Sequence, residues 1–491
     1  MALLVLTAIV VSWGQPDAPA PWLDEGLNWS AARALVTQGR YGLDSADGFR
    51  PFSTAIQTGP TVIIPAALSF AFFGLEVEYA RRVVGLYSLL AVIGVFASAW
   101  IVFQSPWRAV LAVVVMLLGS PEPDSSFVPM ARQFLGETAA LAWYLVGLSA
   151  WLIVLRGDRG WTTRRGLLLI LAGLGFGLAG LTKSQMALVL GPSLVLVGLA
   201  DQLWYRRQSI DAYVVPLALY GAVTGGWGLV QWSLLGPEQF ALHVELLRET
   251  ALMHVLTFDG QHWLMALGVL WRSGFLIWGL PTLIWLGWRA RSRDAVGLMH
   301  GAAAALPVVG LIWFTLFSFG WPRYAYYVMT VSAFWSVGLA ADVWVGSAQR
   351  TIWIRRAAVL GVGGWLAFTG LASQLMQIVQ PEDDGFRAMR RYLATAIPAD
   401  AVIETWEWPL AIDPTPRFRF PQQETLNSVT HYLQNLREWP PMGAFVADRP
   451  AGRYVLVGPF GAWTGIYEIW VADRTPRVQF GAYVLYDLGE P

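Results

Sequence analysis

Two adjacent carboxylates, Asp24 and Glu25, follow the chain's short apolar opening in the stretch PWLDEGLNWSAARALVTQGRY. A carboxylate held at a membrane surface can act as a general base or as a metal ligand. A structural role is the simpler interpretation of Asp24, because Asp is a preferred helix N-cap and Gly39 is a suitable C-terminal stop. The residues alone favour capping, and capping and catalysis are compatible in one side chain.

A second stretch, SPEPDSSFVPMARQFLGE, supplies further ionisable side chains: Glu122, Asp124, Arg132 and Glu137. A polar loop that simply contacts water is the plainer interpretation. Prolines flank Glu122 on both sides, however, and they stiffen the backbone in a way that suits a positioned group. Which of these carboxylates takes part in chemistry stays open at this point.

Three cations interrupt or border apolar runs. Lys183 in LAGLTKSQMAL is the least expected, because positive charge is disfavoured at an outer turn. Snorkelling to the lipid headgroups and binding of an anion are equally good explanations for it. Arg323, followed by Tyr324 in FGWPRYAYY, offers the same chemistry, and Arg272 in LWRSGF offers it more weakly because it can mark a helix end.

Several common chemistries lack support. The chain has no cysteine, which excludes disulfides and thiolate sites. His243, His254 and His262 are widely spaced, and no H-E-x-x-H motif, P-loop or G-x-S-x-G motif is present. The sequence indicates no cofactor, and it leaves open whether the protein requires a divalent cation, Mg²⁺ or Mn²⁺.

These groups must be positioned by membrane helices. The hydrophobic fraction is 56% and charged residues make up only 13%, which indicates a polytopic membrane protein. Eleven apolar runs, from Ala2–Trp13 to Ala357–Ile378, predict about eleven crossings. The first run is short for a crossing and suggests a clipped or misassigned start. The run Thr61–Gly74 is also too short, and we expect it to be interfacial or re-entrant.

This scheme puts the basic clusters RGDRGWTTRR, YRRQ, RARSR and QRTIWIRR on the cytoplasmic side, in agreement with the positive-inside rule. Asp24, the second acidic stretch and Lys183 then face outward. From about Pro381 short strand patterns alternate with Pro, Gly and Asp turns. We therefore expect residues 1–380 to form an all-α transmembrane domain with interfacial helices in the first outer loop, and residues 381–491 a small extracytoplasmic α+β domain.

The order of motifs resembles the GT-C membrane glycosyltransferases that use polyprenyl-phosphate sugars, a group that includes the aminoarabinose transferase of lipid A and protein O-mannosyltransferases. The resemblance is carried by DEGLNWSAARALVTQGRY, GPTVIIPAALSFAFFG and EYARRVVGLYSLLAV, and later by LGETAALAWYLVGL, GLAGLTKSQMALVLGP and WPRYAYYVMTVSAF. One departure is QTGP, where relatives often have a Lys or His before a Pro pair.

The resemblance implies that Asp24, with Glu25 beside it, opens the catalytic loop and acts as the base, and that transfer inverts the anomeric centre. It also implies a lipid-phosphate leaving group, for which Lys183, Arg323, Tyr324 and Arg132 are the candidate ligands. We expect a glycosyltransferase of the bacterial inner membrane that takes its donor from membrane lipid, binds no nucleic acid and has an unknown acceptor. The alternatives are a transporter or flippase of lipid-linked sugars and a non-catalytic assembly or sensor protein.

Overall fold

The computed structural model describes residues 1–12, 19–258, 260–345, 352–379, 385–415, 417–421, 425, 429, 450 and 452–489. The chain divides into two compact units. Unit 1 comprises Met1–Trp13, Thr58–Val62 and Val84–Val379, and unit 2 comprises Gly14–Gln57, Ile63–Val83 and Gln380–Pro491. Two helices, α3 (Pro60–Phe73) and α4 (Val77–Phe103), run from one unit into the other.

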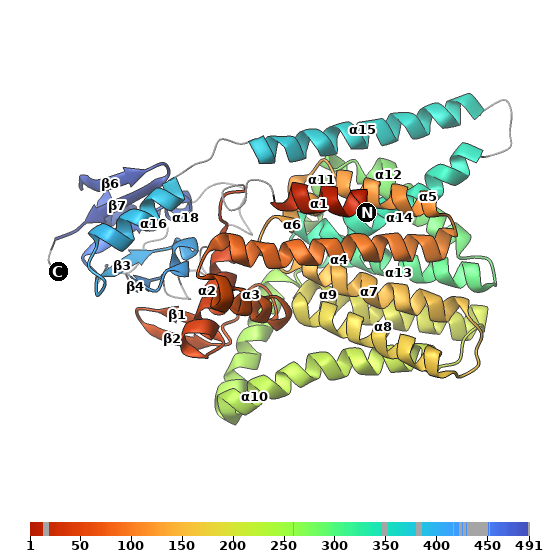
Figure 1. Cartoon of the computed structure of the whole chain (residues 1–491), viewed down its shortest axis with the longest axis horizontal. Helices are drawn as coiled ribbons and strands as arrows, with labels where there is room; N and C mark the ends of the chain where they lie inside the picture. The colour runs from red at the N-terminus through yellow and green to blue at the C-terminus, as the bar shows by residue number, and fades with distance from the viewer. Residues whose placement is uncertain are drawn as a thin grey trace. The chain divides into compact units, whose positions relative to one another are not determined.

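Unit 1 is helical (Figure 1). Besides its parts of α3 and α4, it contains α1 (Ala2–Ser12), α5 (Pro106–Leu118), η1 (Pro123–Ser125), α6 (Phe127–Ala131), α7 (Glu137–Arg156), α8 (Thr163–Thr182), α9 (Ser184–Ala200), η2 (Asp201–Tyr205), α10 (Asp211–His254), α11 (Gly260–Arg272), α12 (Phe275–Arg289), α13 (Ala295–Leu316), η3 (Pro322–Ala325), α14 (Tyr326–Val345) and α15 (Ile352–Val379).

Eight of the helices within the described residues are long and apolar enough to cross a membrane. A bent pair, α11 and α12, meets the same test jointly with a 92° angle between its members and raises the number to nine. The helices α1, α3 and α5 are apolar but shorter. The chain is thus a multi-pass membrane protein, while the expected count of eleven crossings is not confirmed.

One expected outer loop is instead helical. We expected a loop from Gly236 to Trp263, yet α10 continues to His254 and α11 begins at Gly260. The helix is interrupted only by a kink at Gly236, where φ is 76° and ψ is 167°. Such a φ favours glycine, and Pro237 directly after it suits the first turn of the continuing helix. The polar residues after the kink concealed the helix in the sequence.

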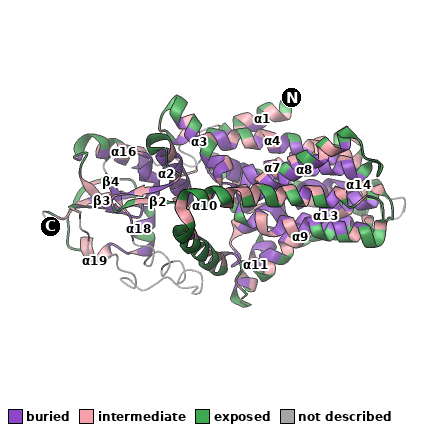
Figure 2. Cartoon of the chain, turned by 90° about the horizontal axis from the view of Figure 1, so that it is seen from below, coloured by how far each residue is buried: buried purple, intermediate pink, exposed green. Residues whose placement is uncertain are grey.

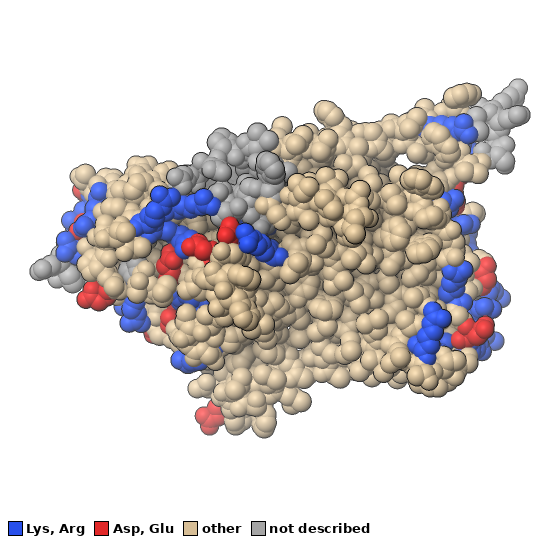
Figure 3. Space-filling view, in the orientation of Figure 1, with Lys and Arg blue, Asp and Glu red and all other residues tan. Residues whose placement is uncertain are grey.

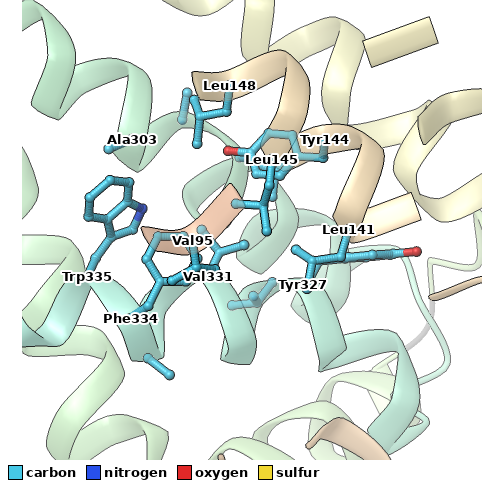
Figure 4. Packing of buried hydrophobic residues seen from close by; sticks show 14 of the residues in the cluster. Val95, Leu141, Tyr144, Leu145, Leu148, Ala303, Tyr327, Val331, Phe334 and Trp335 are labelled. Carbon is cyan, nitrogen blue, oxygen red and sulfur yellow. The ribbon is translucent and has the colours of Figure 1, made fainter. Parts of the chain in front are cut away.

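The core of unit 1 is built from α4, α7, α13 and α14. Figure 4 shows Val95, Leu145, Ala303 and Trp335 converging from these four helices. All four side chains are buried. By contrast α10 is exposed along most of its length, as the green ribbon in Figure 2 shows. Apolar side chains on such an exposed helix suit contact with lipid.

Basic side chains gather at the end of this bundle where α7 ends and α8 begins (Figure 3). Hydrogen bonds between largely buried groups stabilise this end of the bundle. Arg165 donates to Asp211 Oδ2 (3.2 Å) and to Gln208 Oε1 (2.9 Å), and Asp201 accepts from the backbone N–H of Gln208 (2.9 Å). The bonds of Arg165 tie the start of α8 to the loop before α10 and to Asp211, the first residue of α10.

Unit 2 combines helices with two sheets. Its elements are α2 (Leu23–Gln38), β1 (Gly42–Ser45), β2 (Gly48–Pro51), α16 (Gly385–Ala396), β3 (Val402–Thr405), η5 (Trp408–Ile412), β4 (Arg417–Arg419), β5 (Tyr454–Val457), α18 (Pro459–Thr464), α19 (Glu468–Val471), β6 (Pro476–Phe480) and β7 (Tyr483–Asp487). The pair β1–β2 is antiparallel. The larger sheet has the order β4-β3-β5-β7-β6, with β4, β3 and β5 parallel and β7 antiparallel to both of its neighbours.

The fold is thus an all-α membrane bundle plus a small sheet region built largely from the C-terminal part of the chain, as the sequence predicts.

Candidate active site

The first candidate residue, Asp24, is the second residue of α2. The helix begins at Leu23, its N-cap is Trp22, and the cap side chain makes no hydrogen bond. Glu25, at the third position, instead accepts from the backbone N–H of Trp22 (3.2 Å). The prediction that Asp24 is the N-cap is therefore wrong, whereas Gly39 ends the helix as expected, with φ of 65° and its N–H bonded to Leu35 O.

Glu25 also forms a buried ion pair with Arg81. Arg81 donates through Nε to Glu25 Oε1 (2.9 Å) and through Nη2 to Glu25 Oε2 (2.7 Å), and both side chains are completely buried. Arg81 Nη2 also donates to the carbonyl of Pro19 (2.9 Å), so one guanidinium fixes both the start of α2 and the segment before it. Paired in this way, Glu25 positions the helix that carries Asp24.

Sequence reasoning missed Arg81, because an arginine at the start of an apolar run reads as the boundary of a crossing. The one feature of the sequence that could have pointed to Arg81 is its position in EYARRVVG, a stretch that contributes to the family resemblance.

Asp24 itself is 6% exposed, and every residue of α2 from Asp24 to Ala34 is buried. A helix buried on all sides requires close partners. Gly26 packs directly against the backbone of Trp408 and Pro409, and a Cβ there would overlap both. Arg33 Nη1 donates to Asp413 O (2.8 Å), which ties the same helix to the C-terminal segment. The orientation of Asp24 is thus set within unit 2.

In unit 1, Glu137 and Lys183 form a second buried pair. Glu137 is the first residue of α7, and Lys183 joins α8 to α9. Lys183 Nζ lies 3.0 Å from Glu137 Oε1, and the side chains are 1% and 2% exposed. Lys183 is therefore buried rather than extended toward the headgroups, so snorkelling does not explain it.

The QTGP segment sits beside this pair. The backbone N–H of Gly59 donates to Thr182 O (2.9 Å), and the hydroxyls of Thr61 and Thr182 lie 2.6 Å apart. A Cβ at Gly59 would overlap the carbonyl oxygen of Leu181. Glycine at position 59 therefore has a packing reason, since only glycine permits the approach.

The second acidic stretch provides two carboxylates that face arginines. Glu122 Oε2 lies 3.8 Å from Arg272 Nε, and burial together with the charge of Asp124 raises the pKa of Glu122 against the opposing effect of Arg272. Burial likewise raises the pKa of Asp124, while the charge of Arg323 lowers it. Both carboxyls thus hold protons more readily than a solvated acid would.

Arg323 and Tyr324 lie in η3. The guanidinium of Arg323 is 5.4 Å from the ring centroid of Trp321, and Tyr324 is 6% exposed with its ring against Phe319 at 5.2 Å. Arg132, at the end of α6, is 1% exposed and donates to Val10 O (2.6 Å). This hydrogen bond links α1 to α6. Of the candidate cations, Arg272 is the most accessible, with a side chain 62% exposed.

Two of the three widely spaced histidines, His243 and His262, are buried. His243 contacts Gln231 at 3.4 Å and His254 ends α10. Among the described residues no three His, Asp or Glu side chains lie close enough together to hold a metal ion. The described part of the chain therefore contains no cluster of ligands suited to a metal ion.

Solved structures provide the comparison, since no family model and no curated protein matches this sequence. ArnT from Cupriavidus metallidurans bound to undecaprenyl phosphate is similar over 99% of this chain and 98% of its own, with a TM-score of 0.64 and 16% identity. The apo structure of the same protein gives 0.63 at 16% identity, over 99% and 97%.

An archaeal oligosaccharyltransferase, AglB from Archaeoglobus fulgidus in complex with an inhibitory peptide and a dolichol-phosphate, is also similar. It has a TM-score of 0.55 and 13% identity, and the match covers 86% of this chain and 61% of AglB. Since the ArnT matches extend over nearly the whole length of both chains, the chain has the fold of ArnT.

Proposed function

We propose that this protein is a membrane glycosyltransferase that moves a sugar from a polyprenyl-phosphate carrier to an acceptor, with inversion at the anomeric carbon. The observation that carries the proposal is the likeness over 99% of the chain to a structure with undecaprenyl phosphate bound. Fold alone does not imply function. The proposal therefore also depends on a carboxylate and a set of cations whose chemistry suits the reaction.

The reaction needs a base. An acceptor hydroxyl or amine attacks the anomeric carbon, the bond from that carbon to the phosphate oxygen breaks, and the electron pair stays on the phosphate. The acceptor loses one proton during attack, and in our proposal Asp24 takes it. Asp24 suits this role because it is held on a fully packed helix, and its neighbour Glu25 is already neutralised by Arg81.

The departing lipid phosphate gathers negative charge and is stabilised by a fixed cation. We assign this role first to Arg272 and Arg323. The pairing of Arg272 with Glu122 is loose at 3.8 Å and its side chain is 62% exposed, so a phosphate can replace the carboxylate as its partner. The charge of Lys183 is already matched by Glu137, 3.0 Å away. We therefore assign Lys183 an indirect role, through its ion pair with Glu137, rather than direct contact with the phosphate.

We further propose that residues 1–380 carry the reaction at the outer face of the cytoplasmic membrane and that residues 381–491 lie outside. The distribution of basic loops supports this orientation. Lipid-linked donors require no nucleotide site on that side. The partners we expect are the lipid-linked donor, membrane lipids and an acceptor whose nature stays open.

The test is a cell-free transfer assay with the purified protein and a panel of polyprenyl-phosphate sugars, read by mass spectrometry. Sugar release onto an added or co-purified acceptor, together with free polyprenyl phosphate, is the expected result. Arg272→Met should raise the donor KM more than Arg248→Met, a control on the exposed part of α10 with a 69% exposed side chain. Movement of intact donor between leaflets without bond cleavage would instead support a flippase.

A further inference from the structure

Glu407 is a buried carboxylate of unit 2 that the reaction proposed above does not use. It lies directly before η5 and is completely buried. Its Oε1 accepts from the backbone N–H groups of Phe460 and Gly461 (2.9 Å each), in the first turn of α18. Burying a carboxylate is costly. Here the side chain links two segments, η5 and α18, that lie more than 50 positions apart along the chain.

The backbone and the side chain of Glu407 are both held in place. The backbone N–H of Glu407 donates to Thr405 Oγ1 (3.0 Å), and its carbonyl accepts from the N–H of Leu410 (3.0 Å). The side chain fits closely against the start of α18, because a Cβ at Gly458 would lie 2.6 Å from Glu407 Cδ. Glu407 therefore joins η5 to α18 in one fixed geometry.

The helix α18 contacts the residue at which α2 begins. The ring of Phe460 lies 5.1 Å from the ring of Trp22, edge to face, an arrangement that stabilises an aromatic pair. Trp22 is the N-cap of α2, and its backbone N–H is the group that donates to Glu25. The side chain of Glu407 thus holds Phe460 where its ring supports the start of α2.

The segment η5 contacts the same turn of α2 from a second direction. Trp408 and Pro409 follow Glu407 directly, and a Cβ at Gly26 would lie 2.8 Å from Trp408 Cβ and 2.4 Å from Pro409 N. The ring of Trp408 stacks on Phe420, with the centroids 3.5 Å apart and the planes within 7°. Both segments that Glu407 joins therefore pack against the first turns of α2.

We propose that Glu407 is a positioning residue for Asp24, acting through α18 on Trp22 and through η5 on Gly26. The inference rests on the function proposed above, in which Asp24 accepts the proton. Trp22 and Gly26 lie two residues before and two residues after Asp24, so the two contacts fix the chain on both sides of it. Misplacing a catalytic group by about 1 Å can lower a rate roughly 100-fold. The effect of Glu407 should therefore appear in kcat and not in the donor KM.

This positioning role requires a hydrogen-bond acceptor and not a charge. Burial raises the pKa of Glu407 from 4.5 to about 7, against the opposing effect of the backbone N–H groups. Oε1 accepts in either protonation state. Glu407→Gln keeps a carbonyl oxygen in the same place, whereas Glu407→Ala removes it. The two variants therefore separate the acceptor from the charge.

Glu404 provides a matched control. It is a second buried carboxylate, three residues before Glu407, and it accepts from Arg419 (3.0 Å) and from the backbone N–H of Gly452 (3.3 Å). Glu404→Ala therefore removes a buried acceptor of unit 2 without removing the bonds to α18. A general loss of stability in this sheet region should affect both alanine variants alike.

The first experiment measures kcat and donor KM of the full-length variants in the transfer assay, with melting temperatures alongside. We expect Glu407→Ala to lower kcat by roughly 10–100-fold with a donor KM within about twofold of wild type. Glu407→Gln and Glu404→Ala should keep kcat within about threefold of wild type. A wild-type kcat in Glu407→Ala, or an equal fall in Glu404→Ala, would overturn the inference.

The second experiment introduces Glu407→Ala into the Asp24→Asn protein. The added loss in kcat should be less than about twofold, because the group that Glu407 positions is already removed. An equal loss in both backgrounds would mean that Glu407 does not act through Asp24. Normal turnover of Asp24→Asn would overturn the proposed function itself. An impaired Asp24→Asn beside a normal Glu407→Ala would overturn this inference alone.

A third measurement needs no activity. With 5-fluorotryptophan at position 22 only, the ¹⁹F NMR signal reports on the surroundings of this ring. Glu407→Ala should shift or broaden the signal, because the ring of Phe460 is no longer held beside Trp22. Glu407→Gln and Glu404→Ala should leave it unchanged. An unchanged signal in Glu407→Ala would overturn the contact between Glu407 and the start of α2.

If Glu407→Ala fails to fold, Glu407→Asp replaces it. The shorter side chain keeps the carboxyl group but withdraws the acceptor by one C–C bond, about 1.5 Å. It should therefore lower kcat at an unchanged donor KM and shift the ¹⁹F signal of position 22. Wild-type values of kcat and of the signal in Glu407→Asp would overturn the inference.

Discussion

Lys183 Nζ lies 3.0 Å from Glu137 Oε1 in the interior of unit 1, and neither side chain is more than 2% exposed. This relationship changes what a substitution of Lys183 can reveal. Its removal leaves a buried carboxylate without its cation, so loss of folding and loss of donor binding become mixed in a single variant.

We therefore predict that Lys183→Met lowers the free energy of unfolding by roughly 3–5 kcal/mol, the usual cost of breaking a buried pair from one side. The double variant Lys183→Met/Glu137→Met should recover most of that loss, because it removes both charges. Thermal unfolding of the three proteins in one detergent measures the difference. A double variant no more stable than Lys183→Met would show that the two charges are not coupled.

The Arg81–Glu25 pair predicts a contrast between adjacent arginines. Arg81→Met should destabilise the protein by roughly 3–5 kcal/mol, because Glu25 is left buried and charged. Arg82→Met is the matched control: its side chain is 60% exposed and its pair with Glu78 spans 3.6 Å, so its loss should cost less than about 1 kcal/mol. Equal melting temperatures for the two variants would contradict the positioning role of Arg81.

Glu407 predicts a dependence of stability on pH. Its Oε1 accepts from the N–H groups of Phe460 and Gly461 (2.9 Å each), yet burial dominates and raises its pKa from 4.5 to about 7. A raised pKa means that the folded state holds the proton more tightly than the unfolded state does. The contribution of Glu407 is then fully present below about pH 4.5 and is lost as the pH rises through about 7.

The loss should amount to about 3 kcal/mol between those limits. Glu407→Gln, which is neutral throughout, should flatten this part of the stability curve. Thermal unfolding of both proteins from pH 5 to pH 8 gives the comparison. A wild-type curve that falls no faster than that of Glu407→Gln would show that Glu407 does not titrate in this range.

The orientation in the membrane can be tested because the chain has no cysteine of its own. A cysteine at Asp473, an exposed position of unit 2, should react with an impermeant thiol reagent in intact spheroplasts. A cysteine at Gly160, exposed between α7 and α8, should react only after lysis. The reverse pattern would invert the topology. The position near Glu424, another natural choice, lies outside the described residues.

Much of the fold could be predicted from the sequence, because long apolar runs leave few alternatives in a bilayer. The expected runs Thr138–Leu155 and Gly166–Leu181 match α7 and α8 within one to three residues at each end. The prediction failed after Gly236, where α10 continues as a helix although its sequence is polar. A polar stretch after a Gly-Pro pair was interpreted as a loop.

The site was harder to predict. Residue types pointed to Asp24 and Lys183, but the partners of a charged group come from distant parts of the chain. Arg81 is 56 positions from Glu25, and Lys183 and Glu137 meet only because α7 and α8 pack together. The N-cap assignment failed because the sequence around Asp24 does not distinguish an Asp at the N-cap from an Asp in the first turn of a helix whose N-cap is Trp22.

Asp24 as the base is the central claim, and Asp24→Asn is its most direct test. Because Asp24 does not cap α2, the exchange of one oxygen for an NH₂ group removes proton acceptance and leaves the cap of the helix unchanged. Turnover with the polyprenyl-phosphate sugar identified in the transfer assay should fall by roughly 10²–10⁴-fold, while melting temperature and donor binding stay near wild type. Turnover within about twofold of wild type, in a variant that is folded and binds donor normally, would contradict the account.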